Sequence, residues 1–229
     1  MNPWWDQVMD KQIADLRVSY DTGALAPADL GDEPLAAFSA WFTAADAAGL
    51  VEPNAMVLAT ADAAGAPSTR TVLLKGVDAR GFTFFTNLGS RKSRDLNANP
   101  NTSVTFPWFS MHRQVVVVGR AELIARDEVA EYFGSRPRDS QLGAWVSRQS
   151  EVIEDRSILD LRFNELVDDY ADIDVPLPDF WGGWLIRPVT IEFWQGRTSR
   201  LHDRLRFTAL HAEAALDDQS AWTLERLSP

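Results

Sequence analysis

The chain has 229 residues, of which 45% are hydrophobic and 24% are charged, as in an ordinary globular protein. Its 22 Lys and Arg residues face 33 Asp and Glu residues, and the formal net charge of −11 argues against general binding to nucleic acid or anionic lipid. Cysteine is absent and the three histidines are not spaced as in a metal motif, so neither disulfides nor a metal site are expected.

The first fifty residues are predicted to be helical and to carry no targeting signal. Met1 to Asp6 lacks a basic segment followed by an apolar one. No apolar run approaches the ~20 residues that cross a bilayer, so the expected location is cytoplasmic. Asp32 can cap a helix that has Pro34 in its first turn, and Gly49 can end it.

From Ala55 onward the pattern changes to short apolar runs of strand length, separated by turns rather than by long helices. Strands are predicted at 55–60, 71–75, 82–86, 102–106 and 113–124. Strands at this spacing are typical of an antiparallel barrel or sandwich.

A helix is predicted over 152–170, where apolar residues recur at helical spacing, and Pro176 and Pro178 end it. Three more strands are predicted at 184–194, 201–210 and 221–227, with an acidic surface loop over 212–220. The expected fold class is therefore mainly β, a single-domain antiparallel barrel with flanking helices. Within it, residues 1–50 would form an N-terminal helical segment and residues 51–229 the barrel.

The first candidate binding site begins at Ser90, a good helix cap. It puts Arg91 and Lys92 in the first helical turn, where cations oppose the helix dipole. A phosphate at the helix N-terminus would remove this conflict by binding backbone N–H groups and both side chains. A solvated basic turn is the open alternative.

The second candidate consists of Tyr132, Arg136 and Ser140, which a helix would place on one side because each follows the last by four residues. A phenol, a guanidinium and a hydroxyl together suit a phosphate monoester. Pro137 interrupts such a helix, and an amphipathic helix with its polar residues outward is the simpler interpretation of this segment alone.

The third candidate is the set Arg200, His202 and Arg204, which would project from one face of a strand. These groups repel one another unless an anion or an electron-rich ligand lies against them, and no carboxylate alternates with them. Trp194 offers a flat ring nearby. The pattern predicts a ligand site.

Longer strings carry a resemblance to a known family. They are 70–75 (RTVLLK), 85–92 (FTNLGSRK), 135–145 (SRPRDSQLGAW), 180–183 (FWGG), 193–196 (FWQG) and 200–204 (RLHDR). Together they resemble the pyridoxine/pyridoxamine 5′-phosphate oxidases, in order from about Arg17 to the C-terminus. The resemblance implies an FMN-binding split β-barrel homodimer with the flavin at the subunit interface. It also implies oxidation of pyridoxine or pyridoxamine 5′-phosphate by O2 to pyridoxal 5′-phosphate, with release of H2O2, and of ammonia from the amine.

The same resemblance assigns roles to single residues. The FMN phosphate would be held by Arg70, Lys75, Arg91 and Lys92, and the rest of the cofactor by Thr71, Val72, Leu73, Leu74, Phe85, Thr86, Gln114, Gln149, Ser150, Trp194 and Arg204. The substrate phosphate would be held by Lys75, Tyr132, Arg136 and Ser140, and its ring by Arg200, Leu201 and His202, under a lid that includes Arg17 and Tyr20. Arg200 and His202 would be the catalytic residues.

Some features leave the assignment open. Simple alternation puts Arg70 and Lys75 on opposite faces of a strand, although both are assigned to phosphate. Glu52 stands where a bacterial relative has Asp, and Phe85 replaces a frequent Tyr. The alternatives are a split-barrel reductase with another flavin-type cofactor and a non-catalytic carrier of flavin or pyridoxal phosphate. Neither alternative needs both the string that would bind the substrate phosphate (135–145) and the string that would face the substrate ring (200–204).

Overall fold

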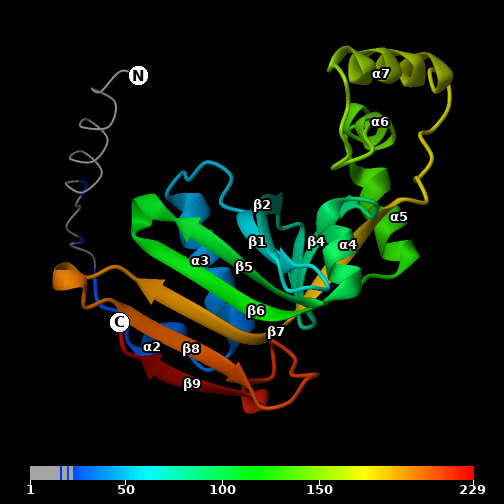
Figure 1. Cartoon of the computed structure of the whole chain (residues 1–229). Coiled ribbons are helices and arrows are strands. Elements are labelled where there is room, and N and C mark those ends of the chain that lie inside the picture. Colours follow the sequence, from blue (N-terminus) through cyan, green and yellow to red (C-terminus); the bar gives the residue numbers. More distant parts are fainter. Residues whose placement is uncertain (1–15, 17–19, 21–22) are drawn as a thin grey trace.

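The computed structural model describes residues 16, 20 and 23–229, and its centre is a nine-stranded antiparallel sheet (Figure 1). The strands are β1 (Ala55–Ala61), β2 (Pro67–Leu73), β3 (Gly76–Asp78), β4 (Gly81–Asn87), β5 (Asn101–Trp108), β6 (Arg113–Leu123), β7 (Trp181–Gln195), β8 (Asp203–Ala209) and β9 (Trp222–Leu227). Their order is β2-β1-β5-β6-β7-β4-β3, and β8 and β9 continue from β7.

The long strand β7 curls this sheet. One edge of β7 pairs with β6, whereas the other edge pairs first with β4 and then, from Thr190 onward, with β8. Its register with β6 shifts between Val118 and Gly119, and such a bulge bends a strand and increases its twist. The result is the mainly β, single-domain split barrel that the sequence predicted.

Helices cover the sheet on both sides of this bend. They are α2 (Pro27–Leu30), α3 (Pro34–Ala47), α4 (Arg91–Ala98), α5 (Arg126–Ser135), α6 (Arg138–Val146) and α7 (Ser157–Asp169), with 3₁₀ turns at Phe109–Met111, Thr198–Arg200 and Gln219–Ala221. Among the described residues, no helix is both long and apolar enough to cross a membrane.

The main core lies between α3 and the sheet. The Phe38 ring packs edge-on against Phe82 with centroids 4.9 Å apart, and it lies 5.1 Å from Phe106. These rings are fully buried and bring the helix against β4 and β5. The predicted N-terminal helix is present, although its N-cap falls on Glu33 rather than Asp32.

A second, smaller core lies under α5, α6 and α7, which stand together at one end of the sheet (Figure 1). Leu142 and Leu166 are buried there with Trp181 of β7. The helix predicted over 152–170 begins only at Ser157, and Val152 is fully exposed rather than part of its buried stripe. This end of the molecule positions the candidate site.

Gly119 is required at the bulge, because a Cβ atom there would lie 2.0 Å from the carbonyl oxygen of Arg187. We expect Gly119→Ala to lower the free energy of unfolding by about 3 kcal/mol, since backbone atoms cannot move aside as a flexible side chain can. The matched control is Gly134→Ala in α5, where a Cβ meets nothing within 4 Å. Alanine favours a helix, so this variant should be at least as stable as the wild type. Chemical denaturation measures both, and equal midpoints would contradict the close approach.

Candidate active site

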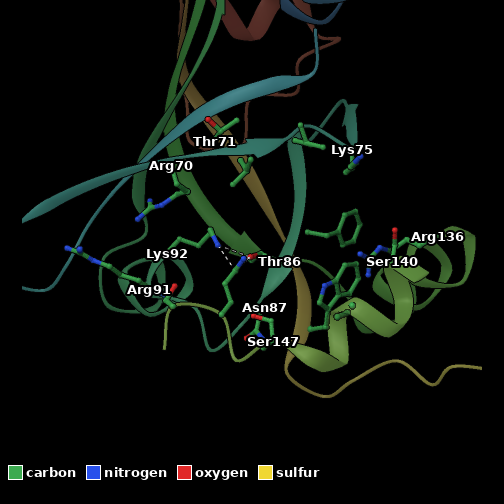
Figure 2. A pocket seen from close by; sticks show the side chains of 18 of the residues that line it. Arg70, Thr71, Lys75, Thr86, Asn87, Arg91, Lys92, Arg136, Ser140 and Ser147 are labelled. Atoms are coloured by element: carbon green, nitrogen blue, oxygen red, sulfur yellow. Dashed lines mark hydrogen bonds between the residues drawn. The ribbon is translucent and has the colours of Figure 1, made fainter. Parts of the chain in front are cut away.

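A cavity of about 760 Å³ lies between β2, β4, the start of α4 and the helices α5 and α6 (Figure 2). Four separate segments of the chain bring predicted site residues to its wall. Those residues are Arg70, Thr71, Val72, Leu73, Lys75, Phe85, Thr86, Arg91, Lys92, Tyr132, Arg136, Ser140, Gln149 and Ser150. The first two candidate sites of the sequence therefore lie in one cavity.

The structure explains how Arg70 and Lys75 reach the same cavity. The strand predicted at 71–75 lies at Pro67–Leu73, and the chain then changes neighbours. The Leu74 N–H donates to the Asn54 carbonyl at 2.8 Å, whereas the Lys75 N–H donates to the Thr83 carbonyl at 2.9 Å. Because β2 ends at Leu73, simple alternation does not extend to Lys75, and both Arg70 and Lys75 line the cavity. The Leu74 side chain is buried in the core.

Lys92 is the buried cation at one end of the cavity. Lys92 is only 7% exposed, and its Nζ donates hydrogen bonds to Gln149 Oε1 at 2.7 Å and to Thr86 Oγ1 at 3.0 Å. Burial, with the charge of Arg70 as a second cause, lowers the pKa of Lys92 to about 8. None of the ion pairs found within the described part of the chain includes Lys92. A buried ammonium without a carboxylate partner is stabilised when an anion lies beside it.

The start of α4 adds to this end of the cavity. The helix begins at Arg91 with Ser90 in the N-cap position, as predicted, and the Ser90 side chain makes no capping hydrogen bond. The Arg91 N–H instead donates to Ser150 Oγ at 3.2 Å. Arg70, Arg91 and Lys92 lie close together here (Figure 2). Three cations at a helix N-terminus favour a phosphate over a merely solvated turn.

Arg136 is the cation at the other end of the cavity. It lies in extended conformation between α5 and α6, so the helix breaks at Pro137, as the sequence indicated, and Tyr132 and Ser140 belong to different helices. Its guanidinium stacks on Trp181, 4.7 Å from the ring centroid, and burial lowers the pKa of Arg136. Its Nη1 is buried and has no hydrogen-bond partner. Such an atom calls for an acceptor from a ligand.

Parallel aromatic rings line this second end. Phe85 stacks on Tyr132 with centroids 4.0 Å apart and 14° between the planes, and Trp181 lies nearly parallel to both. Figure 2 places Arg136 and Ser140, with Lys75 nearby, away from Arg70 and Lys92. The cavity thus has two separate cationic ends. Lys75, which the resemblance assigned to both phosphates, lies on the side of Arg136 and not beside Arg70, Arg91 and Lys92.

A second cluster, which does not line this cavity, contains Gln114, Trp194, His202 and Tyr20. Gln114 pairs with Trp194 across β6 and β7, and the Trp194 ring lies 4.6 Å from His202. The Tyr20 ring lies 5.7 Å from that of His202. Arg17 lies outside the described residues.

The third candidate of the sequence needs correction. The strand predicted at 201–210 begins at Asp203, and Arg200 ends a 3₁₀ turn with a φ of 61°. Arg200, His202 and Arg204 therefore do not alternate along one strand face. Arg204 also has a carboxylate partner, because its Nε and Nη2 donate to the two oxygens of Glu192 at 2.8 and 2.9 Å. Glu192 is on the neighbouring strand, where a pattern within one strand cannot reveal it. Leu201 is exposed.

Other lining residues were not predicted. They are Ser68, Thr69, Asn87, Gly143, Ala144, Ser147 and Trp181. Trp181 belongs to the string 180–183 that carried the resemblance, and Ser68 precedes Arg70 at strand spacing, so both had a signal in the sequence.

Comparisons of the sequence with known proteins find matches over nearly the whole chain. The pyridoxamine 5′-phosphate oxidase family matches residues 42–168, and the pyridoxine 5′-phosphate oxidase C-terminal dimerisation region matches residues 181–229. A pyridoxine/pyridoxamine 5′-phosphate oxidase of Salinispora arenicola is 52% identical over 219 residues, which cover 94% of this chain and 96% of that protein. The corresponding protein of Aeromonas hydrophila is 49% identical over 95% of this chain and 99% of its own.

Solved structures agree. PhzG from Burkholderia lata, in complex with tetrahydrophenazine-1-carboxylic acid, has a TM-score of 0.82 at 29% identity and covers 93% of this chain and 100% of its own. An FMN-binding protein from Nostoc punctiforme, related to pyridoxamine 5′-phosphate oxidase, has a TM-score of 0.66 at 16% identity over 90% of this chain and all of its own, which shows the fold alone. The chain belongs to the pyridoxine/pyridoxamine 5′-phosphate oxidase family, a family of flavin-binding split-barrel oxidoreductases.

Proposed function

We propose that the protein oxidises pyridoxine 5′-phosphate and pyridoxamine 5′-phosphate to pyridoxal 5′-phosphate, with FMN as cofactor and O2 as oxidant. Hydrogen peroxide is the second product, and the amine also releases ammonia. The observation that carries the proposal is the single cavity with Lys92 buried at one end and Arg136 at the other, neither with a carboxylate partner among the described residues. FMN and the substrate each carry a phosphate monoester. A reductase or a carrier that binds one phosphate has no need of the second end.

The first end suits the cofactor phosphate. Arg70, Arg91 and Lys92 supply three cations, and Ser150 adds a hydroxyl beside the helix N-terminus. Thr86 and Gln149 already hold Lys92 in place and would border the rest of the cofactor. When bound, FMN supplies the acceptor for the hydride from the substrate C4′ carbon and passes the electrons to O2.

The second end suits the substrate phosphate. Arg136 offers an unpaired N–H, and Tyr132, Ser140 and Lys75 surround it with further donors. The stacked rings of Phe85, Tyr132 and Trp181 give this end an apolar wall, beside which charged hydrogen bonds are stronger than in water. These residues bind and orient the substrate.

We further propose that Arg200 and His202, the catalytic candidates, act on the cavity of a partner copy in a homodimer. Both lie in the matched dimerisation region but outside the cavity of their own chain. His202 Nδ1 accepts a hydrogen bond from the Arg197 N–H at 3.1 Å, so the neutral imidazole carries its proton on Nε2. His202 would donate to the substrate and orient its ring, beside the cationic Arg200.

The proposal predicts a yellow protein whose flavin absorbance bleaches when pyridoxine 5′-phosphate is added without oxygen and returns in air. The bleaching follows from hydride transfer to FMN, and the return follows from reoxidation by O2. Anaerobic absorbance spectroscopy measures both steps, with inorganic phosphate as the control addition. A protein that cannot be reconstituted with FMN, or whose flavin stays oxidised, would exclude the oxidase function.

A further inference from the structure

Two of the three cations at the cofactor end, Arg70 and Arg91, lie near one buried carboxylate, Asp95 of α4. The Asp95 side chain is 6% exposed, and its Oδ2 lies 3.8 Å from Arg70 Nη2 and 4.0 Å from Arg91 Nε. Both distances are too long for a direct hydrogen bond. Asp95 therefore makes no direct hydrogen bond to either guanidinium.

Two hydroxyls stand between Asp95 and Arg70. Thr60 Oγ1 and Ser68 Oγ donate to Asp95 Oδ2 at 2.7 and 3.0 Å. The same two oxygens accept from Arg70, at 2.7 Å from Nη1 and at 2.6 Å from Nη2. A hydroxyl has one proton, so donation to the carboxylate turns its lone pairs toward the guanidinium. The carboxylate thus fixes both hydroxyls as acceptors for Arg70.

This arrangement leaves part of Arg70 for a ligand. Its third hydrogen bond among the described residues runs from Nη1 to the Leu58 carbonyl at 3.4 Å. A guanidinium has five N–H donors, so Nε–H and one Nη2–H are not used by these bonds. The two hydroxyls therefore hold Arg70 at the wall of the cavity while two of its donors remain for a ligand.

The charge at this end also fits the cofactor. Burial alone would raise the pKa of Asp95, but the hydrogen bonds from Thr60 and Ser68, with the charges of Arg91 and Arg70, outweigh it and leave the pKa below its ordinary range. Asp95 is therefore ionised at neutral pH. Three cations and one carboxylate leave about two positive charges, which match the charge of about −1.5 to −2 on a phosphate monoester.

We propose that Asp95 is a positioning residue for the FMN phosphate, acting through Thr60 and Ser68 to orient the Arg70 guanidinium. The inference rests on the proposed function, because it takes the phosphate at this end to be that of FMN. A positioning role and a simple charge effect predict opposite changes in FMN affinity when Asp95 is neutralised. Loss of a negative charge beside a phosphate would by electrostatics alone tighten FMN binding. Loss of the orientation of Arg70 would weaken it.

The test compares the dissociation constants of FMN and riboflavin for the apoprotein, from the quenching of flavin fluorescence. We expect Asp95→Asn to weaken FMN binding about tenfold and to change riboflavin binding less than about twofold, because riboflavin has no phosphate. Thr60→Val should show the same selective loss without any change of charge. Thr60 is 3% exposed and does not line the cavity, so its effect has to pass through Arg70. The control Asp172→Asn removes an exposed carboxylate and should leave both constants unchanged.

Two outcomes would overturn the positioning role. One is FMN binding that is unchanged or tighter in Asp95→Asn, because such a result would show only the electrostatic effect of removing a negative charge and no loss of orientation of Arg70. The other is equal loss of FMN and riboflavin binding in Thr60→Val, since a general structural defect does not distinguish the two flavins. If Asp95→Asn does not fold, Thr60→Val decides alone. A wild-type protein that does not prefer FMN to riboflavin would instead overturn the proposed function, so the two failures are distinguishable.

Discussion

Lys92→Met is expected to weaken FMN binding about 100-fold and, at the same time, to stabilise the ligand-free protein. Lys92 is one of three cations at the cofactor end, and it is the one buried without a carboxylate partner among the described residues. A shift of its pKa from 10.5 to about 8 corresponds to roughly 3 kcal/mol against the folded ligand-free protein at neutral pH. Methionine removes this penalty. It also leaves Thr86 Oγ1 hydrogen-bonded to Gln149 Oε1 at 3.0 Å, so we expect a net gain of about 1–2 kcal/mol.

The same residue sets a pH dependence. A bound phosphate raises the pKa of Lys92 above its ligand-free value of about 8, so binding takes up a proton above that pH. FMN affinity should therefore change little between pH 7 and about pH 8, where the phosphate is mostly a dianion, and fall as the pH rises further. The stability of the ligand-free protein should change in the opposite direction. Between about pH 8 and 10.5 the unfolded chain holds this proton and the folded chain does not, so the free energy of unfolding rises with pH.

Fluorescence titrations with FMN from pH 7 to 9.5, and denaturation over the same range, measure both trends. Lys75→Met is the matched control, because Lys75 is an exposed lysine at the other end of the cavity. This variant should keep the pH profile of FMN binding, whereas Lys92→Met should lose it. A profile that persists in Lys92→Met would mean that another group titrates.

The sequence could predict most strands because their apolar runs are local. β1, β4, β5 and β6 lie close to their predicted places. β2 was misplaced because its sequence PSTRTVL has no apolar run, and the strand lies at the edge of the sheet with its residues partly exposed. Pro137 predicts the break between α5 and α6. The direction of the chain after this proline could not be predicted, because it depends on tertiary packing.

The binding groups were predictable where they lie within one string, such as Arg91 and Lys92. The sequence pattern alone could not predict that they share a cavity with Arg136, because contacts between residues far apart in sequence leave no local pattern. Only the family resemblance indicated this arrangement. The same reason hid the Glu192 partner of Arg204 and the hydroxyls that link Asp95 to Arg70. Local chemistry indicated which groups could bind anions, and the fold determined which of these groups share a cavity.

Arg136→Ala should remove most of the preference for phosphorylated substrate, which is the second large effect. The wild-type site has a buried guanidinium N–H without a partner, and a phosphate satisfies it with a charge-assisted bond. Sites built around such donors can reject an analogue that lacks the acceptor by as much as roughly 10⁴-fold. Without Arg136, the KM for pyridoxine 5′-phosphate should rise by about 100-fold or more, while turnover of unphosphorylated pyridoxine stays close to that of the wild type. Bound FMN should be unchanged, because Arg136 lies at the other end of the cavity from Lys92.

Arg138→Ala is the control for this variant. Arg138 is an arginine two residues away, but its guanidinium donates to the carbonyls of Tyr170 and Ile173 and does not line the cavity. Its loss can lower stability by releasing the end of α7, yet it should leave the ratio of kcat/KM for the two substrates unchanged. Steady-state kinetics of both variants on both substrates, with FMN content measured by absorbance, gives the comparison. If Arg136→Ala strips FMN, or if both variants keep the wild-type ratio, the segment from Tyr132 to Ser140 does not bind the substrate phosphate. In that case the aromatic end of the cavity has another ligand, and the unpaired Nη1 of Arg136 has to be explained by it.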